Sequence, residues 1–229
     1  MIKCIIFDAY GTLLSTGNGS VDAVREILKG KNISIAPEEF YRKWKELHRK
    51  HIDELISFIN EKTIFEKDLK ALYDFYNIDG DYRKDVRYML DSLENRQAYP
   101  EVNKVLNLLS KAFYICIGST TDSKPLLNDL KKNNINVNAV FTSESVGIYK
   151  PKKEFYLEIL NKTGYNESEV LFVGDSLIDD NYGPQQLNIK TCWVNRKDAS
   201  YDDKIRPDYI INSLEELLSI PIIKKIIDV

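Results

Sequence analysis

The 229-residue sequence predicts an α/β protein whose mostly parallel sheet is interrupted by an inserted block of helices. After Tyr99, short apolar runs alternate with helical patterns, which is the spacing of strands joined by crossover helices. Between residues 20 and 95, amphipathic helical patterns follow one another without a comparable strand signal. We therefore expect a core domain made of residues 1–16 and 97–229 and a helical domain made of residues 17–96.

The expected strands of the core are short apolar runs. The first ends at Asp8, and a loop rich in Gly, Ser and Thr follows it. The later strands are expected at residues 113–117, 137–141, 170–173, 191–194 and 209–211. Residues 213–229 should form one or two closing helices, broken at Pro221. A sheet of this kind places its ligand crevice beyond the carboxyl ends of the strands, so functional residues should directly follow them.

The inserted block carries four helical stripes. They begin near Ser20, after Pro37, near Leu69 and near Val86. The second stripe is expected to present Phe40, Trp44, Leu47, His51, Leu55 and Phe58 on one apolar face. The basic residues of that helix lie largely off the stripe and are expected on a solvated face; they are Arg42, Lys43, Lys45, Arg49 and Lys50. No role is predicted for His48 or His51.

Charge and hydropathy argue against two classes of partner. The 32 basic and 35 acidic residues leave a net charge of −3 with both signs interspersed, so nucleic acid is not expected as a partner. No apolar run approaches the roughly 20 residues that span a bilayer, so no membrane contact is expected. The first residues show no secretory signal pattern, and we expect a cytoplasmic protein.

The cysteine and histidine content argues against disulfides, zinc sites and histidine-based catalysis. Cys4, Cys116 and Cys192 lie in apolar runs without C-x-x-C spacing, which is typical of buried, reduced thiols rather than a disulfide framework or zinc site. With two histidines in the chain, a Ser-His-Asp triad or a multi-histidine metal centre is disfavoured. Catalysis is expected to use carboxylates.

Charged and hydroxyl side chains follow three of the expected strands. Asp8 follows the first, Ser119 and Thr120 the second, and Asp175 the fourth. The ammonium of Lys150, which begins the next helical pattern, is expected at the same edge, where it would neutralise a substrate anion. Asp8 and Asp175 would repel each other at close range unless they shared a hard cation, and Mg²⁺ commonly takes one or two carboxylates. The sequence therefore predicts a magnesium site and a small anionic substrate.

Four segments at these positions resemble the motifs of the haloacid dehalogenase (HAD) superfamily. They are Asp8-Ala9-Tyr10-Gly11-Thr12, Ser119, Lys150-Pro151, and Gly174-Asp175-Ser176 followed by Asp179 and Asp180. Their order and spacing match, and the resemblance covers nearly the whole chain. It implies a Rossmann-like core with an inserted helical cap domain, and it implies a hydrolase.

The resemblance also implies roles for individual residues. The Asp8 carboxylate would attack phosphorus, or carbon in the dehalogenase branch, and water would then hydrolyse the aspartyl intermediate. The expected catalytic residues are Asp8, Ser119 and Lys150. The residues expected to bind substrate or phosphate are Tyr10, Gly11, Thr12, Ser119, Thr120 and Lys150. The expected Mg²⁺ ligands are Asp8, the Tyr10 carbonyl, Asp175 and Asp180, with Asp179 as the alternative to Asp180.

Tyr10 departs from the phosphatase pattern. Phosphatases of this superfamily usually place an Asp two residues after the nucleophile, where it protonates the leaving group and then activates water. Such positioned proton transfer contributes about 10²- to 10⁴-fold to a rate. The run from Asp8 to Thr12 instead resembles the first motif of 2-haloacid dehalogenases, in which a halide leaves without a proton. This motif favours carbon–halogen chemistry.

The fourth motif favours phosphoryl chemistry. The dehalogenase branch works without metal and typically replaces the Gly-Asp of this site, whereas Gly174 and Asp175 are present here. That branch also carries Asn where Thr120 stands, and its cap arginine has no convincing counterpart in Arg42. We therefore expect Mg²⁺-dependent hydrolysis of a small phosphate monoester, with a 2-haloacid dehalogenase or a non-catalytic binding module as alternatives.

Overall fold

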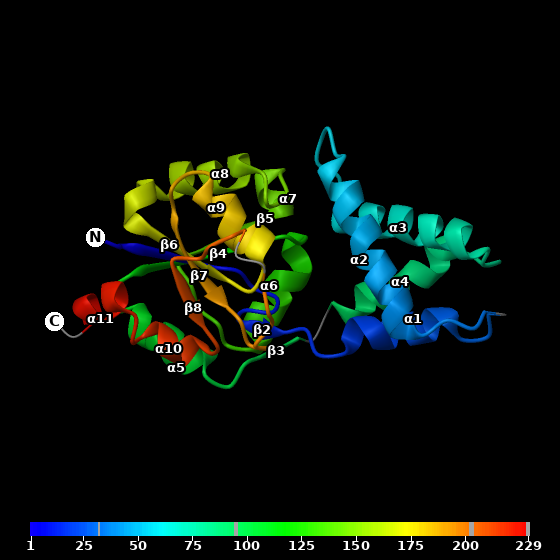
Figure 1. Ribbon diagram of the computed structural model, residues 1–229, viewed down its shortest axis with the longest axis horizontal. Coiled ribbons are helices and arrows are strands. Elements are labelled where there is room, and N and C mark those ends of the chain that lie inside the picture. Colours follow the sequence, from blue (N-terminus) through cyan, green and yellow to red (C-terminus); the bar gives the residue numbers. More distant parts are fainter. Residues whose placement is uncertain (32, 94–95, 202–203, 228–229) are drawn as a thin grey trace.

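The computed structural model describes residues 1–31, 33–93, 96–201 and 204–227. A six-stranded sheet forms the centre of the core, in the order β5-β4-β1-β6-β7-β8, and every neighbouring pair is parallel (Figure 1). The strands are β1 (Cys4–Phe7), β4 (Tyr114–Ser119), β5 (Ala139–Thr142), β6 (Val170–Gly174), β7 (Lys190–Val194) and β8 (Tyr209–Ile211). The predicted α/β class with a parallel sheet is confirmed.

Helices bury the sheet on both faces. The core helices are α5 (Val102–Leu109), α6 (Ser123–Lys132), α7 (Ser143–Val146), α8 (Lys153–Thr163), α9 (Gly183–Gln185), α10 (Leu214–Leu217) and α11 (Pro221–Ile227), with the short helical turns η1 (Glu167–Glu169) and η2 (Leu177–Tyr182). Ile5 and Phe7 of β1 pack in one cluster with residues of α5, α6, α10 and α11, whereas Cys4 and Ile6 pack in another with residues of α8. A parallel strand covered on both faces is apolar throughout, as β1 is.

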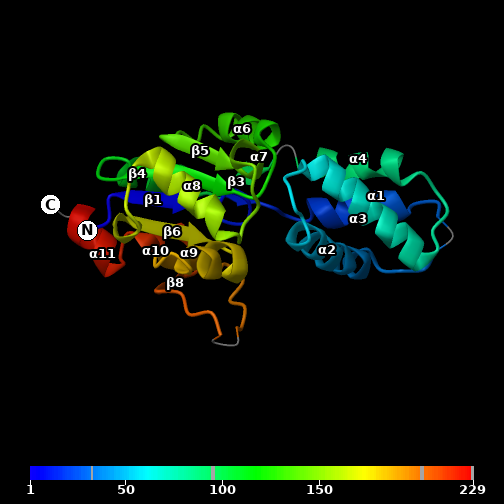
Figure 2. The same cartoon turned by 90° about the horizontal axis from the view of Figure 1, so that it is seen from above.

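The order of the strands defines where a ligand can bind. From β1 the chain proceeds outward to β4 and β5, and it then returns to the opposite side of β1 to form β6. This reversal places a topological switch point between β1 and β6, where open α/β sheets bind ligands beyond the strands' carboxyl ends. Those ends point toward the remaining helices, while the N-terminus and helix α11 lie at the far end of the core (Figure 2).

The helical unit comprises α1 (Gly19–Leu28), α2 (Pro37–Asp53), α3 (Glu61–Tyr76) and α4 (Tyr82–Ser92). Its helices share a hydrophobic cluster of their own, which includes Val24, Phe40, Leu69, Leu72 and Met89. The two chain segments that connect it to the core pair as a short antiparallel ribbon, β2 (Leu14–Ser15) with β3 (Gln97–Ala98). This ribbon was not predicted, because two-residue strands carry no periodic signal.

The prediction for the second helix was wrong at its end. Leu55 and Phe58 were expected on the helical stripe, but α2 ends at Asp53. The ring of Phe58 instead stacks on Tyr149 of the core, with 5.4 Å between ring centroids, and Leu55 packs in the same small cluster. Asn60 then begins α3 by accepting a hydrogen bond from the Thr63 amide. Contact with the core therefore overrides the local periodicity.

The structure bears on the predictions for the cysteines and for membrane-spanning segments. The three cysteines are buried and free, and the sulfur atoms of Cys4 and Cys116 lie 3.9 Å apart. Among the helices of the described residues, none combines the length and the apolar character that crossing a bilayer requires.

Candidate active site

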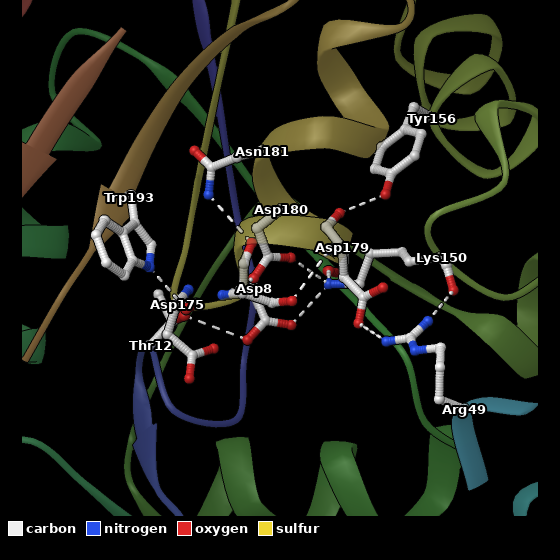
Figure 3. A network of polar contacts seen from close by, with 12 residues as sticks. Asp8, Thr12, Arg49, Lys150, Tyr156, Asp175, Asp179, Asp180, Asn181 and Trp193 are labelled. Atoms are coloured by element: carbon white, nitrogen blue, oxygen red, sulfur yellow. Dashed lines mark hydrogen bonds and ion pairs between the residues drawn. The ribbon is translucent and has the colours of Figure 1, made fainter. Parts of the chain in front are cut away.

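The Lys150 side chain reaches Asp8 and Asp180 at the carboxyl-terminal edge of the sheet (Figure 3). This side chain is 2% exposed, and Nζ donates to Asp8 Oδ1 at 2.8 Å, to Asp180 Oδ1 at 2.7 Å and to the Gly118 carbonyl at 3.0 Å. Burial alone would lower the pKa of Lys150, but the charges of Asp180 and Asp8 outweigh it and raise that pKa above its ordinary value. Lys150 precedes α8, which begins at Lys153 rather than at Pro151.

Thr12 joins the first strand's loop to the loop after β6. Its hydroxyl donates to Asp8 Oδ2 at 3.2 Å and accepts from the Asp175 amide at 3.1 Å. Gly11, which directly precedes Thr12, has φ +95°, and a Cβ at this position would come within 2.2 Å of Asp175 Oδ2. Glycine is therefore required at this position by both backbone conformation and space. Gly11 and Thr12 thus shape the loop that carries Asp8.

Three carboxylates converge beside Lys150. Asp8, Asp175 and Asp180 each offer one oxygen atom, and these atoms all lie within 4.8 Å of one another. Desolvation by surrounding protein atoms and the charge of Asp8 raise the pKa of Asp175, although part of its side chain reaches solvent. Burial also raises the pKa of Asp180, against the opposing effect of Lys150. Such a set of hard oxygen donors, mutually destabilised when charged, fits Mg²⁺.

The turn after β6 orders two adjacent aspartates. It is a π-helical turn, η2, of a type often found at functional sites. Ser176 caps it, with Oγ accepting from the Asp179 amide at 3.0 Å, and Asp180 Oδ2 accepts from the Ser176 amide at 2.9 Å. Asp180 therefore joins the carboxylate cluster, whereas Asp179 faces the helical unit.

A cavity of about 140 Å³ opens above these groups. It is lined by Asp8, Tyr10, Ser119, Thr120, Lys150, Asp175, Ser176, Asp179 and Asp180. The structure thus brings together all the predicted site residues except Gly11 and Thr12, which support the loop below. Ser119 is 1% exposed, and the buried Thr120 hydroxyl has no hydrogen-bond partner among the described residues. An anion in the cavity would satisfy that hydroxyl.

The Tyr10 hydroxyl is already engaged elsewhere. It donates to Asp129 Oδ2 at 3.3 Å, and Asp129 is fully buried on α6. Burial and the charge of Asp129 raise the pKa of Tyr10 far above its ordinary value. Tyr10 is therefore a poor proton donor at neutral pH.

Arg49 of α2 reaches this site, which the sequence did not predict. Its guanidinium donates to Asp179 Oδ2 at 2.6 Å and to the Lys150 carbonyl at 3.4 Å. The expectation of a solvated face is wrong for Arg49, because that side of α2 faces the core. Arg42 does remain in solvent, 68% exposed and 3.5 Å from Glu46. Helical periodicity marks the two arginines alike, so no signal in the sequence separates them.

A second cavity of about 210 Å³ lies between the helical unit and the core. It is lined by Tyr10, Thr16, Ser20, Tyr41, Trp44, Lys45, His48, Glu61, Phe65, Met89, Leu93, Arg96 and Thr120. The two cavities share Tyr10 and Thr120 as lining residues, so they adjoin there. Burial raises the pKa of Glu61 to about 7, while His48 and a hydrogen bond from Thr121 oppose the rise.

Comparison with curated proteins gives relatives that align along nearly the whole chain. Glyceraldehyde 3-phosphate phosphatase of Methanocaldococcus jannaschii is 26% identical over 96% of this chain and 97% of its own. Pyrimidine 5'-nucleotidase PynA of Streptococcus pneumoniae is 24% identical over 94% of this chain and 93% of its own.

Solved structures of similar fold include an L-2-haloacid dehalogenase and a putative hydrolase bound to magnesium. The L-2-haloacid dehalogenase RSc1362 superposes with a TM-score of 0.80 at 18% identity, over 97% of this chain and 99% of that one. The putative HAD-hydrolase YfnB of Bacillus subtilis, bound to magnesium, gives 0.77 at 22% identity, over 96% and 98%. At these identities the likeness concerns the fold.

A family model settles the class. The model described as haloacid dehalogenase-like hydrolase matches residues 2–180, which include all four motifs at the sheet edge. A second model, of HAD-hydrolase-like proteins, matches residues 148–217. The chain is therefore a hydrolase, and it belongs to the haloacid dehalogenase-like family.

Proposed function

We propose that this hydrolase cleaves a small phosphate monoester with the help of Mg²⁺, through a covalent aspartyl phosphate on Asp8. The observation that carries the proposal is the carboxylate cluster beside Lys150, in which Asp175 adds a third acid to Asp8 and Asp180. A metal-free dehalogenase has no use for Asp175, because a third acid destabilises a site without a cation. The phosphatase and nucleotidase relatives support the same choice.

The residues around Asp8 suit a nucleophile. One carboxylate oxygen is held by Lys150 and the other by Thr12, so rotation of the group is restricted before substrate binds. Lys150, Ser119 and Thr120 would then hydrogen-bond the equatorial oxygens of the phosphoryl group. The backbone amides that follow Asp8 add further donors for a transition state in which negative charge develops.

Asp8, Asp175 and the Tyr10 carbonyl would bind the metal ion directly, with Asp180 supporting it. When bound, Mg²⁺ supplies Lewis acidity and offsets the charge of the phosphoryl oxygens. Without a cation, desolvation and the charge of Asp8 raise the pKa of Asp175 against the opposing charge of Lys150.

We further propose that residues 17–96 act as a cap domain that selects the substrate. The second cavity supports this assignment, because residues of the helical unit and the core line it jointly. Its lysine and arginine suit a small anionic substrate. The buried free cysteines support a cytoplasmic location.

A 2-haloacid dehalogenase is the second candidate function, and the first motif favours it. The run from Asp8 to Thr12 resembles the first motif of 2-haloacid dehalogenases, and Tyr10 supplies no proton for an alkoxide leaving group. Hydrolysis of a carbon–halogen bond in a 2-haloacid is therefore the alternative activity. Membership of a hydrolase family weighs against a non-catalytic binding module.

The test compares the two chemistries under the same conditions. Phosphate release from p-nitrophenyl phosphate is measured with Mg²⁺ and with EDTA, and halide release is measured from 2-chloropropionate. The Asp8→Asn variant is the blank. Mg²⁺-dependent phosphate release that the variant lacks supports the proposal. Halide release without phosphate release would replace it with the dehalogenase.

A further inference from the structure

A buried carboxylate in the helical unit orients two histidines. Asp68 of α3 is fully buried, and it accepts hydrogen bonds from Trp44 Nε1 at 3.1 Å, His48 Nδ1 at 2.7 Å and His51 Nδ1 at 2.5 Å. A carboxylate accepts only, so each imidazole places its proton on Nδ1. Nε2 of each ring is then left for another partner, as in dyads where an acid sets the tautomer of a catalytic histidine.

The two histidines differ in what they face. His48 lines the second cavity together with Phe65, whose ring centroid lies 5.1 Å from that of the imidazole. His51 is buried and is not among the residues that line that cavity. The His51 imidazole is therefore buried beside Asp68, whereas the His48 imidazole borders the second cavity, where a substrate could bind.

His48 directly precedes Arg49, whose guanidinium contacts the Lys150 carbonyl and Asp179. The cavity that His48 lines includes Tyr10 and Thr120, which also line the cavity over Asp8. His48 therefore lines a cavity that adjoins the cavity over Asp8.

We propose that His48, positioned by Asp68, is the proton donor to the leaving group and then the base that activates water. This inference rests on the proposed phosphatase function, and it fills the role for which Tyr10 is unsuited. Positioned histidines are the commonest groups for such proton transfer.

The proposed reaction has two steps, and each conserves atoms and charge. An Asp8 oxygen forms a bond to phosphorus while the ester P–O bond breaks, and the electron pair of that bond stays on the ester oxygen. Nε2–H of the imidazolium gives its proton to that oxygen, so the alcohol leaves neutral. The neutral imidazole then takes a proton from water as the water oxygen attacks phosphorus. Asp8 is released as carboxylate, phosphate leaves, and the imidazolium is restored.

Other titratable groups face the same space. Glu61 comes from α3, Tyr41 and Lys45 come from α2, Arg96 directly precedes β3, and Tyr10 comes from the loop after β1. Asp68 lies behind His48 and does not line the cavity. Of these, Glu61 is the competing proton donor. Its carboxyl already accepts from the Thr121 hydroxyl at 3.0 Å, at the beginning of α3. A direct comparison of His48 and Glu61 therefore belongs in the experiment.

The experiment uses two aryl phosphates that differ chiefly in their need for a proton. p-Nitrophenolate leaves as a stable anion, whereas phenolate from phenyl phosphate is far more basic. In the His48→Gln variant we expect kcat/KM for phenyl phosphate to fall by about 10²- to 10⁴-fold. For p-nitrophenyl phosphate we expect a loss of less than about tenfold, because proton donation contributes little there.

Matched variants separate chemistry from structure. His51→Gln removes the other imidazole from Asp68, and it should leave the ratio of the two rates as in the wild type. A folding defect would lower kcat/KM for both substrates by the same factor, so it would not change the ratio of the two values. The inference would be overturned if His48→Gln lowered kcat/KM equally for both substrates. It would also be overturned if Glu61→Gln, instead of His48→Gln, selectively lowered kcat/KM for phenyl phosphate. If the wild type releases no phosphate from either ester, the proposed function itself fails.

Discussion

The guanidinium of Arg49 lies 2.6 Å from the carboxylate of Asp179, and this contact ties helix α2 to the turn that follows β6. Asp180, the next residue in that turn, bonds Lys150. The helical unit is thus linked to the carboxylate cluster through two adjacent side chains. The Arg49 side chain is 33% exposed and that of Asp179 is 14% exposed, so water screens the pair only in part.

Loss of the Arg49 contact should weaken substrate binding. We expect Arg49→Met to raise KM and lower kcat/KM about tenfold, which corresponds to about 1.4 kcal/mol. The reason is that the helical unit would be held less firmly over the cavity. Arg42→Met on the same helix is the matched control, because Arg42 bonds only the exposed Glu46 among the ion pairs of the described residues. Steady-state kinetics that gave both variants the same values would contradict this role.

Removal of Lys150 should destabilise the fold as well as the chemistry. Lys150→Met leaves the buried Asp8 and Asp180 without their cation, and breaking a buried ion pair in this way costs about 3–5 kcal/mol. Urea denaturation without metal measures the loss. Lys152→Met serves as control, since that exposed ammonium donates only to the Leu55 carbonyl among the contacts of the described chain. A midpoint equal to that of the wild type would show that the acids are not charged in the folded state.

Asp175 should control the effect of Mg²⁺ on stability. A ligand at 100 times its Kd adds about 2.7 kcal/mol to the free energy of unfolding. We expect the wild-type Tm to rise with Mg²⁺, and we expect Asp175→Asn to lose most of that rise. In EDTA the variant should be the more stable of the two proteins, because one repelling charge is gone. Equal metal-induced shifts in both proteins would remove Asp175 from the ligand set.

Glu61 should impose a pH dependence on stability. Its pKa is about 7 in the folded chain against an ordinary value of 4.5, so the folded state holds the proton more tightly. The free energy of unfolding therefore falls as pH rises from about 4.5 to about 7, and it levels off above, for a total on the order of 3 kcal/mol. Glu61→Gln should lack this fall.

Denaturation at pH 5 and pH 8 tests the Glu61 prediction. Glu38→Gln, which alters a side chain 67% exposed, supplies the background pH dependence. If the wild type and Glu61→Gln gave parallel curves, the carboxyl would be charged in both states at neutral pH.

The sequence predicted the parts of the site that depend on local signals. Asp8, Ser119 and Asp175 each follow an apolar run that predicts a buried strand, and parallel strands bring their carboxyl ends to one edge. Lys150 was recognised through its motif, and the structure brings all four residues to one cavity.

The remaining features depend on contacts between distant segments. Arg49 meets Asp179 across 130 residues, and nothing in the helical pattern of α2 distinguishes it from Arg42. The position of His48 depends on Asp68, which is buried by a helix packing that single-residue periodicity does not encode. Phe58 left its expected helix because Tyr149 offered a stacking partner. In each case tertiary packing decided the outcome.

The Thr12 hydroxyl connects residues made at very different times during synthesis. Asp175 lies 163 positions after Thr12, and Lys150 lies 142 positions after Asp8. On the ribosome Asp8 therefore emerges long before Lys150 and Asp175, and the whole helical unit is made in between. The carboxylate cluster is completed only when β6 pairs with β1, because Asp175 and Asp180 follow that strand. A chain truncated before β6 therefore holds Asp8, Thr12 and Lys150 but lacks the other two acids of the cluster.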